Sequence, residues 1–263
     1  MPLATVNEPT VVDALRGDRV SRPPTDRWTA SGLRAQIDDG LFAIFGDDAD
    51  GSVVTISPKD FRDHQDAVAS SELALARGVL VSYVLRLVVA GVGLDDPYED
   101  ALAAWRSTDP SRVDAVCATL DRDDLARLAT DVRAHSATLL KTLGPINPLW
   151  RPRTALRVVQ RLHGGRVICR DVVDLVVGSV GTERASVAIV DVTTSALGPT
   201  HERLMRYHAL LHTLRTSVVP LRVAALSTAT GEMWHHDVDN DTLQRGVADL
   251  LEILRSRPSQ EAA

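Results

Sequence analysis

The chain has 263 residues, a formal net charge of −6 and 44% hydrophobic residues. This length suits one large domain or two small ones, with enough apolar residues for a substantial core. The acidic balance excludes a uniformly polycationic protein, and the two cysteines lack the spacing of a zinc or iron–sulfur site. No signal peptide is visible, and the longest apolar run, 79–93, is too short and too interrupted to span a bilayer. We therefore expect a reduced, cytoplasmic protein without a membrane partner.

The first half of the chain is predicted to be mainly helical. Residues 1–26 carry prolines and charges without an apolar period, which predicts a flexible tail, with a short helical turn near Val11 to Leu15. The elements expected next are a helix starting near Ser31, a short strand at 41–45, an acid-rich turn at 46–51, a strand at 52–56 and a helix at 72–90 that Ser70 or Ser71 caps. Residues 95–143 are predicted to form an inserted helical block, with helix starts at Asp109 and at Asp121 or Asp123.

After the break at 144–148, the pattern changes from helical spacing to alternation. Leu156, Val158 and Leu162 alternate with polar residues, and Gly164-Gly165 is typical of a hairpin turn. The elements expected next are strands at 166–177, 185–193, 220–227 and 232–238, a helix at 201–216 that Thr200 caps, and a last helix from Asp241 or Thr242 to Arg255. Residues 256–263 are expected to be a flexible tail. The chain is thus predicted to be an α/β fold in which helices flank a mixed central sheet.

One long stretch without acids carries many basic residues. Between Val132 and Arg170 there is no Asp or Glu, and the second part of this span holds Arg151, Arg153, Arg157, Arg161, Arg166 and Arg170. Guanidinium groups on a strand can pair with successive phosphates, which would give salt-sensitive and sequence-independent binding. The alternative is a basic surface that pairs with acids of the helical block.

Two buried-looking strands each carry one aspartate, Asp174 in VVDLVVG and Asp191 in AIVDVTTS. An acid in so apolar a run is expensive to bury without a partner. Mg²⁺ prefers carboxylate oxygens, and carboxylates on adjacent strands are a good way to hold it. The alternative is that each aspartate caps a loop or a helix.

The order of these motifs resembles the PD-(D/E)XK nuclease superfamily, in its RecB-like exonuclease branch. Asp174 matches the first metal-binding acid, Asp191 the acid of the Asp-x-Lys-Thr motif, and Tyr207 the tyrosine of Gln-x-x-x-Tyr. Residues 76–82, ARGVLVS, resemble the helix that normally supplies a metal-binding histidine. The likeness spans about residues 28–238. It implies a restriction-endonuclease-like core, extended here to a single domain at 27–255 with the insertion at about 95–143.

The chain departs from this family at the positions that carry the chemistry. Ser82 stands at the histidine position, Thr193 at the catalytic lysine, Arg203 at the glutamine and Asp171 at the glycine before the first acid. Threonine carries no cation and serine is a poor replacement for an imidazole ligand. Only Lys59 and Lys141 could supply a displaced lysine, and an arginine could hardly act as a base.

These losses predict an inactive nuclease fold with a DNA-binding or scaffolding role. We expect no cofactor, or weakly bound Mg²⁺ or Mn²⁺ at Asp174 and Asp191, and a DNA surface that includes Arg203 and Tyr207 beside the Arg151–Arg170 strip. Two alternatives stay open, an active metal-dependent DNase and a protein-interaction module, whose partner could be another protein or a second copy. His201, His208 and His212 share one side of a predicted helix. They could join an acid in a metal site, or lie exposed or at the edge of the core.

Overall fold

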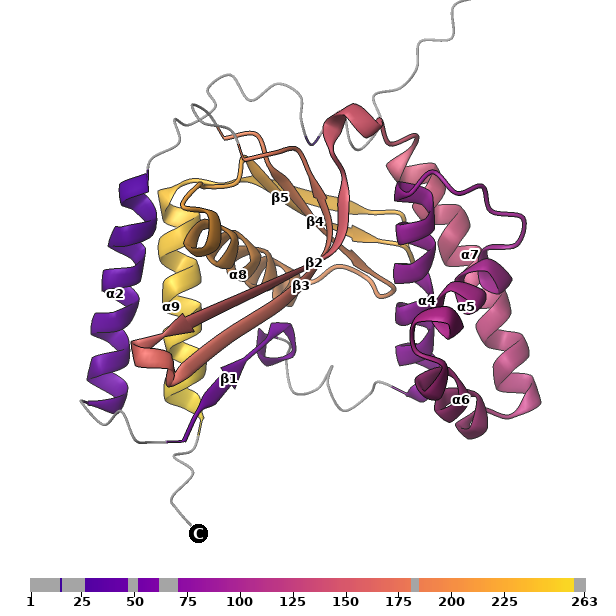
Figure 1. The fold of residues 1–263 in the computed structure, drawn as a ribbon, viewed down its shortest axis with the longest axis horizontal. Helices are drawn as coiled ribbons and strands as arrows, with labels where there is room; N and C mark the ends of the chain where they lie inside the picture. The colour runs from indigo at the N-terminus through magenta and orange to yellow at the C-terminus, as the bar shows by residue number, and fades with distance from the viewer. Residues whose placement is uncertain (1–14, 16–26, 47–51, 62–70, 181–184, 258–263) are drawn as a thin grey trace, which may run out of the picture.

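A six-stranded mixed β-sheet forms the centre of the fold, with helices on both of its faces (Figure 1). The computed structural model describes residues 15, 27–46, 52–61, 71–180 and 185–257. The strands are β1 (Val54–Ile56), β2 (Arg153–Leu162), β3 (Val167–Val177), β4 (Ala188–Thr193), β5 (Arg222–Ser227) and β6 (Met233–Asp237). Their order is β1-β3-β4-β5-β6, with β2 paired to β3. The predicted α/β class with a mixed sheet is confirmed.

Strand β3 is the hub of the sheet. It pairs along most of its length with β2 in an antiparallel hairpin, parallel with β1 at its start, and antiparallel with β4 at its end. Strands β4 and β5 are parallel, and β6 returns antiparallel to β5. The connection from β4 to β5 runs through helix α8 (Pro199–Thr216), because parallel neighbours need a crossover.

The helices form two layers that cover opposite sides of the sheet. Helices α2 (Arg27–Phe45), α8 and α9 (Asn240–Ser256) lie on the left in Figure 1 and build the first core with the sheet. Helices α4 (Glu72–Val89), α5 (Pro97–Thr108), α6 (Pro110–Thr119) and α7 (Arg122–Leu143) lie on the right and build the second core. Short 3-10 turns occur at Pro58–Phe61, Pro148–Trp150 and His163–Gly165. No helix in these described ranges is long and apolar enough to cross a membrane.

The side chains of the β2–β3 hairpin change faces near the end of the hairpin that lies away from its turn. Up to Val173, the alternate residues Cys169 and Val173 of β3 belong to the first core, but Leu175 and Val177 belong to the second. The change falls where Ala155 of β2 adopts a positive φ of 50°. The register continues on both sides of this point, and Ala155 and its opposite residue Asp174 are left out of the ladder. A positive φ is unusual for alanine, so the hairpin holds local backbone strain here.

Several predicted element boundaries are confirmed, and others are wrong for clear reasons. Ser71, Asp109 and Asp121 cap α4, α6 and α7 as predicted. The strand predicted at 41–45 is wrong, because Leu41 continues the helical spacing of Leu33 and Ile37 and all three are buried in the first core.

Two helices also begin earlier than predicted, each for a local reason. Helix α8 begins at Pro199 and not after a Thr200 cap, since proline suits the first helical position. Helix α9 begins at Asn240, because Asp239 accepts a hydrogen bond from the Thr242 amide.

The predicted tails and the acid-rich turn lie largely outside the described residues. Leu15 is described, and it is fully buried in the second core, which is at odds with a free tail at that point. The loop predicted at 178–184 is described only up to Val180.

Candidate functional site

The two candidate acids meet where strands β3 and β4 separate. The pairing of these strands ends at Leu175 and Val190, and the next residues in the same register are Asp174 and Asp191. Asp174 Oδ2 accepts a hydrogen bond of 2.9 Å from the backbone amide of Val192. The Val192 amide is therefore bound by a side chain instead of by the neighbouring strand. The place where β3 and β4 separate, at Asp174 and Asp191, is called the fork below.

The fork is unfavourable for negative charge. Burial of its carboxyl, followed by the nearby charge of Asp191, raises the pKa of Asp174 to about 8. The Val192 amide and the nearby His208 act in the opposite direction and are outweighed. At neutral pH one proton is therefore largely retained by the pair, as expected for two carboxylates in one poorly solvated place.

A histidine of helix α8 completes this acidic cluster from the side of the first core. His208 is 1% exposed, and its Nδ1 contacts Oδ2 of Asp171, whose side chain is fully buried. The other ring nitrogen, Nε2, lies 3.6 Å from Oδ1 of Asp191. The imidazole thus bridges two strands, β3 through Asp171 and β4 through Asp191.

The charges of these acids decide the protonation of the bridging ring. Burial by itself lowers the pKa of His208, but the carboxylates of Asp171 and Asp191 outweigh it and raise this pKa to about 10. The ring is therefore an imidazolium at neutral pH. His212, one turn further along α8, shows the opposite case, because burial and then the charges of Arg153 and Arg215 lower its pKa to about 4.

The cluster offers few ligands for a metal ion. Asp174 and Asp191 could each supply a carboxylate oxygen, but within the described parts of the chain no three His, Cys, Asp or Glu side chains are placed to hold a metal. Asp171 Oδ1 is buried and makes no hydrogen bond with any described group. The arrangement is a buried ion cluster whose positive partner is a side chain of the protein.

The lysine position of the nuclease motif carries a hydroxyl that is already bound. Thr193 Oγ1 lies 2.8 Å from Ser195 Oγ and accepts a hydrogen bond from the Ser195 amide. Its carbonyl accepts from the backbone and hydroxyl of Thr228, which also contacts His135 of α7. Thr193 therefore stabilises the loop after β4 and brings no cation to the acids.

The histidine position of the nuclease motif carries no imidazole. Ser82 is half-buried on α4, whose buried side chains share the second core with Leu175 and Val190, the strand neighbours of Asp174 and Asp191. Lys59 and Lys141, the two lysines that could be displaced catalytic residues, are exposed.

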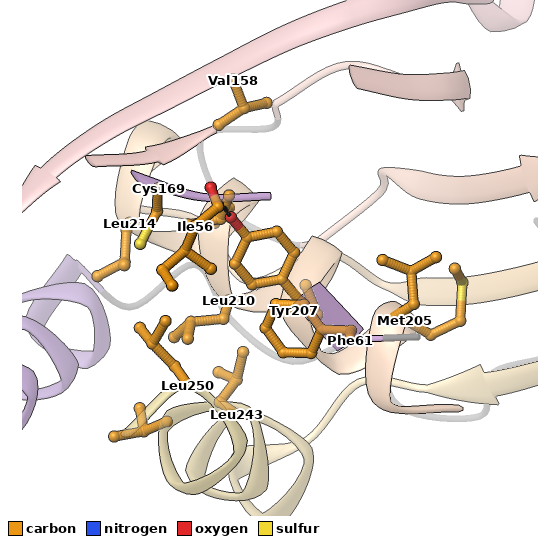
Figure 2. Packing of buried hydrophobic residues seen from close by; sticks show 14 of the residues in the cluster. Ile56, Phe61, Val158, Cys169, Met205, Tyr207, Leu210, Leu214, Leu243 and Leu250 are labelled. Carbon is orange, nitrogen blue, oxygen red and sulfur yellow. Dashed lines mark hydrogen bonds between the residues drawn. The ribbon is translucent and has the colours of Figure 1, made fainter. Parts of the chain in front are cut away.

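Two residues that we expected at a DNA surface serve the protein interior or a helix interface. Tyr207 is fully buried, and its hydroxyl lies within hydrogen-bonding distance of the carbonyl oxygens of Ile56 and Arg170. Figure 2 shows its ring beside Phe61 in the first core. Arg203 forms ion pairs with Asp249 and Glu252 of α9. The prediction of nucleic-acid contact is wrong for Tyr207, because a buried ring cannot reach a ligand.

The arginine strip does not form one surface. Arg157, Arg161 and Arg170 are exposed on the face of the hairpin that points away from the first core. Arg153 lies beyond the change of face at Ala155, and its charge acts on His212 of the first core. Arg166 stacks over the Phe45 ring at 4.5 Å, and Arg151 ends the turn before β2 in the left-handed region.

A hollow at the start of α8 has the wrong lining for a phosphate. It has a volume of about 250 Å³, and Glu202, Glu232, His201 and Trp234 are among its lining residues. Asp174 and Asp191 do not line it. Its two glutamate carboxylates would repel a phosphate group, so the hollow does not suit a nucleotide.

The sequence singled out His208 and Asp171 separately, but it did not predict that they contact each other. The signal for Asp171 was present, because alternation places it on the same face as Cys169 and Val173. A buried acid there required a cationic partner. The signal for His208 was weak, since every residue from Tyr207 to Leu214 is buried and the helix shows no polar side.

No protein-family model and no curated protein matches the chain. Among solved structures, the chain is similar to one described as "Crystal structure of SSO0001", with 11% sequence identity, coverage of 88% of each chain and a TM-score of 0.34.

Proposed function

We propose that this protein is a catalytically inactive nuclease-like protein of the PD-(D/E)XK type that binds DNA without cleaving it. The observation that carries the proposal is the position of His208 between Asp171 and Asp191. Cleavage by this kind of site needs carboxylates that are open to a metal ion and its bound water. Here a buried side chain contacts one carboxylate and approaches a second, so these acids are organised around the protein's own ring.

The surroundings of the acids support the same proposal. Thr193 and Ser195 bind each other at the place where the family motif has its lysine. A group that positions water or stabilises developing charge is therefore missing from that place. DNA binding is supported by the exposed arginines of the β2–β3 hairpin, which suit phosphate groups.

A nuclease assay tests the loss of chemistry. Purified protein is incubated with linear duplex and single-stranded DNA in Mg²⁺ or Mn²⁺, beside Asp191→Ala and the surface control Asp241→Ala. We expect no cleavage above the buffer level in any sample. Cleavage by the wild type and the control that disappears in Asp191→Ala would overturn the proposal in favour of an active metal-dependent DNase.

A binding titration tests the DNA role. Fluorescence anisotropy at low salt should show binding of the wild type to DNA, which weakens as salt is added. The absence of binding to both duplex and single-stranded DNA at low salt would overturn this role and leave the protein-interaction module.

A further inference from the structure

The outer face of the β2–β3 hairpin carries a regular pattern of arginine and aliphatic side chains. In the register of the two strands, every arginine lies opposite an aliphatic residue. The pairs are Arg157 with Val172, Val159 with Arg170, and Arg161 with Ile168. Side chains two apart on a strand point to the same side. These six residues, called the open face below, therefore form a checkerboard on one side of the hairpin.

The open face is exposed although it contains large aliphatic side chains. Val158 and Leu162 of β2 and Cys169 and Val173 of β3 point to the first core, so the residues between them point outward. Val159 is 56% exposed and Val172 is 49% exposed. Exposed aliphatic side chains that are grouped among arginines are typical of a binding surface.

The charge of the open face is not balanced. Within the described ranges, Arg157, Arg161 and Arg170 form no side-chain ion pair or hydrogen bond, whereas arginines elsewhere, such as Arg203 and Arg206, pair with acids of α9. The acid nearest in sequence, Asp171, points to the opposite side and contacts His208.

A further cation lies at the same hairpin. The guanidinium group of Arg215 donates to the carbonyl oxygen of Arg157 at the outer edge of β2. The open face is therefore a positive patch on a protein whose net charge is −6.

The spacing and the composition of the face select the ligand. Arg157 and Arg161 are four residues apart, which corresponds to roughly 13 Å along a strand, and Arg170 lies between them on the neighbouring strand about 5 Å away. Three separate guanidinium groups suit several phosphates better than one. Binding of single-stranded DNA relies on aromatic side chains that stack on bases, and none of the six residues is aromatic. The features favour the backbone of a duplex.

We propose that the open face binds duplex DNA, with Arg157, Arg161 and Arg170 on phosphates and Val159 and Val172 against the deoxyribose rings between them. This inference rests on the proposed DNA-binding function and adds to it the surface and the form of the DNA. Because the three arginines are assigned to phosphates, which carry no sequence information, and the two valines to deoxyribose rings, binding is expected to be independent of sequence.

The test compares two triple variants that change the net charge equally. Arg157→Ala/Arg161→Ala/Arg170→Ala removes the three cations of the open face. The control, Arg106→Ala/Arg112→Ala/Arg127→Ala, removes three exposed arginines, one each from α5, α6 and α7. Far-UV circular dichroism and thermal melting confirm that both fold. Anisotropy titrations then use labelled random-sequence duplex and single-stranded DNA over a range of salt concentrations.

The expected result has three parts. The wild type prefers duplex to single-stranded DNA, and the open-face variant binds duplex more than about tenfold more weakly than the control at low salt. Its slope of log affinity against log salt is shallower by about 2.7, because three phosphate contacts are lost.

Two results would overturn the inference while leaving the proposed function intact. The first is DNA binding by the wild type that the open-face substitutions leave unchanged; if these substitutions also abolish self-association in sedimentation, the face is a protein interface. The second is a preference of the wild type for single-stranded DNA. A wild type that binds no DNA at all would overturn the proposed function as well.

Discussion

His208 Nε2 lies 3.6 Å from Asp191 Oδ1, and this contact ties helix α8 to the strand that carries the second acid of the nuclease-like motif. The other side of the same ring contacts Asp171 on β3. One side chain therefore lies between the two strands that separate at the fork and places its charge beside an acid of each strand.

Replacing His208 by glutamine should destabilise the protein strongly. The substitution removes the imidazolium from between the carboxylates of Asp171 and Asp191, and breaking a buried ion pair in this way costs about 3–5 kcal/mol. Urea denaturation at pH 7 measures the loss. His212→Gln is the matched control, because it replaces a buried ring of the same helix that has no acidic contact among the described residues, and its effect should be smaller. Equal losses in the two variants would contradict the role given to His208.

The same contact predicts a dependence of stability on alkaline pH. The folded protein holds the pKa of His208 at about 10, above the ordinary value of 6.5, so the proton is bound more tightly in the folded state. The stabilisation by His208 is fully present below pH 6.5 and is lost as pH rises through 10. The difference in unfolding free energy between wild type and His208→Gln should therefore shrink over this window. A difference that stays constant from pH 6.5 to 10 would show that the ring is not the cation of the cluster.

Replacing Asp174 by asparagine should stabilise the protein at pH 8 and above. The folded state raises the pKa of Asp174 from 3.8 to about 8, so ionisation opposes folding increasingly as pH rises across this range. An asparagine can still accept the hydrogen bond from Val192 and can donate one towards Asp191. We expect a gain on the order of 1–3 kcal/mol at pH 8 that disappears near pH 4, measured by thermal melting across pH. A variant less stable than wild type at pH 8 would refute this reading of the fork.

Removing the hydroxyl of Tyr207 should affect stability and leave DNA binding unchanged. In Tyr207→Phe, the buried carbonyl oxygens of Ile56 and Arg170 lose their donor while the ring keeps its contact with Phe61. The expected loss is about 1–2 kcal/mol of unfolding free energy. The affinity for duplex DNA, measured by anisotropy on folded protein, should equal that of the wild type. A weaker affinity at unchanged stability would return Tyr207 to the list of DNA contacts.

Replacing Ala155 by glycine should stabilise the hairpin. Ala155 has a φ of 50°, which glycine adopts without the penalty that a Cβ atom causes. We expect a gain of about 1 kcal/mol, measured by urea denaturation. The control is Ala224→Gly in β5, whose backbone has no positive φ, and there glycine should destabilise. Destabilisation at both positions would mean that the conformation of Ala155 carries no strain.

The sequence predicted the elements that hold the candidate acids better than it predicted the surroundings of those acids. Alternating apolar residues and the Gly164-Gly165 turn place β2 and β3 correctly, and the apolar run around Asp191 places β4. The bridge from His208 could not be predicted from helical spacing, because α8 is packed on all sides and its apolar pattern shows no preferred face. Arg153 lies on a different face from Arg157 and Arg161 because Ala155 adopts a positive φ. An alanine in the sequence does not predict a positive φ, so this change of face could not be foreseen.

The change of face at Ala155 also determines how the two helix layers are aligned. A slip of one residue in a strand ladder sends every side chain to the opposite side. Strand β3 supplies Val173 to one core and Leu175 to the other, so a slip would disrupt both cores at the same time. The register of β2 with β3 therefore sets the position of both helix layers relative to the sheet. Only one pairing of β2 with β3 lets both helix layers close, and a mispaired chain would expose apolar surface on both sides of the sheet.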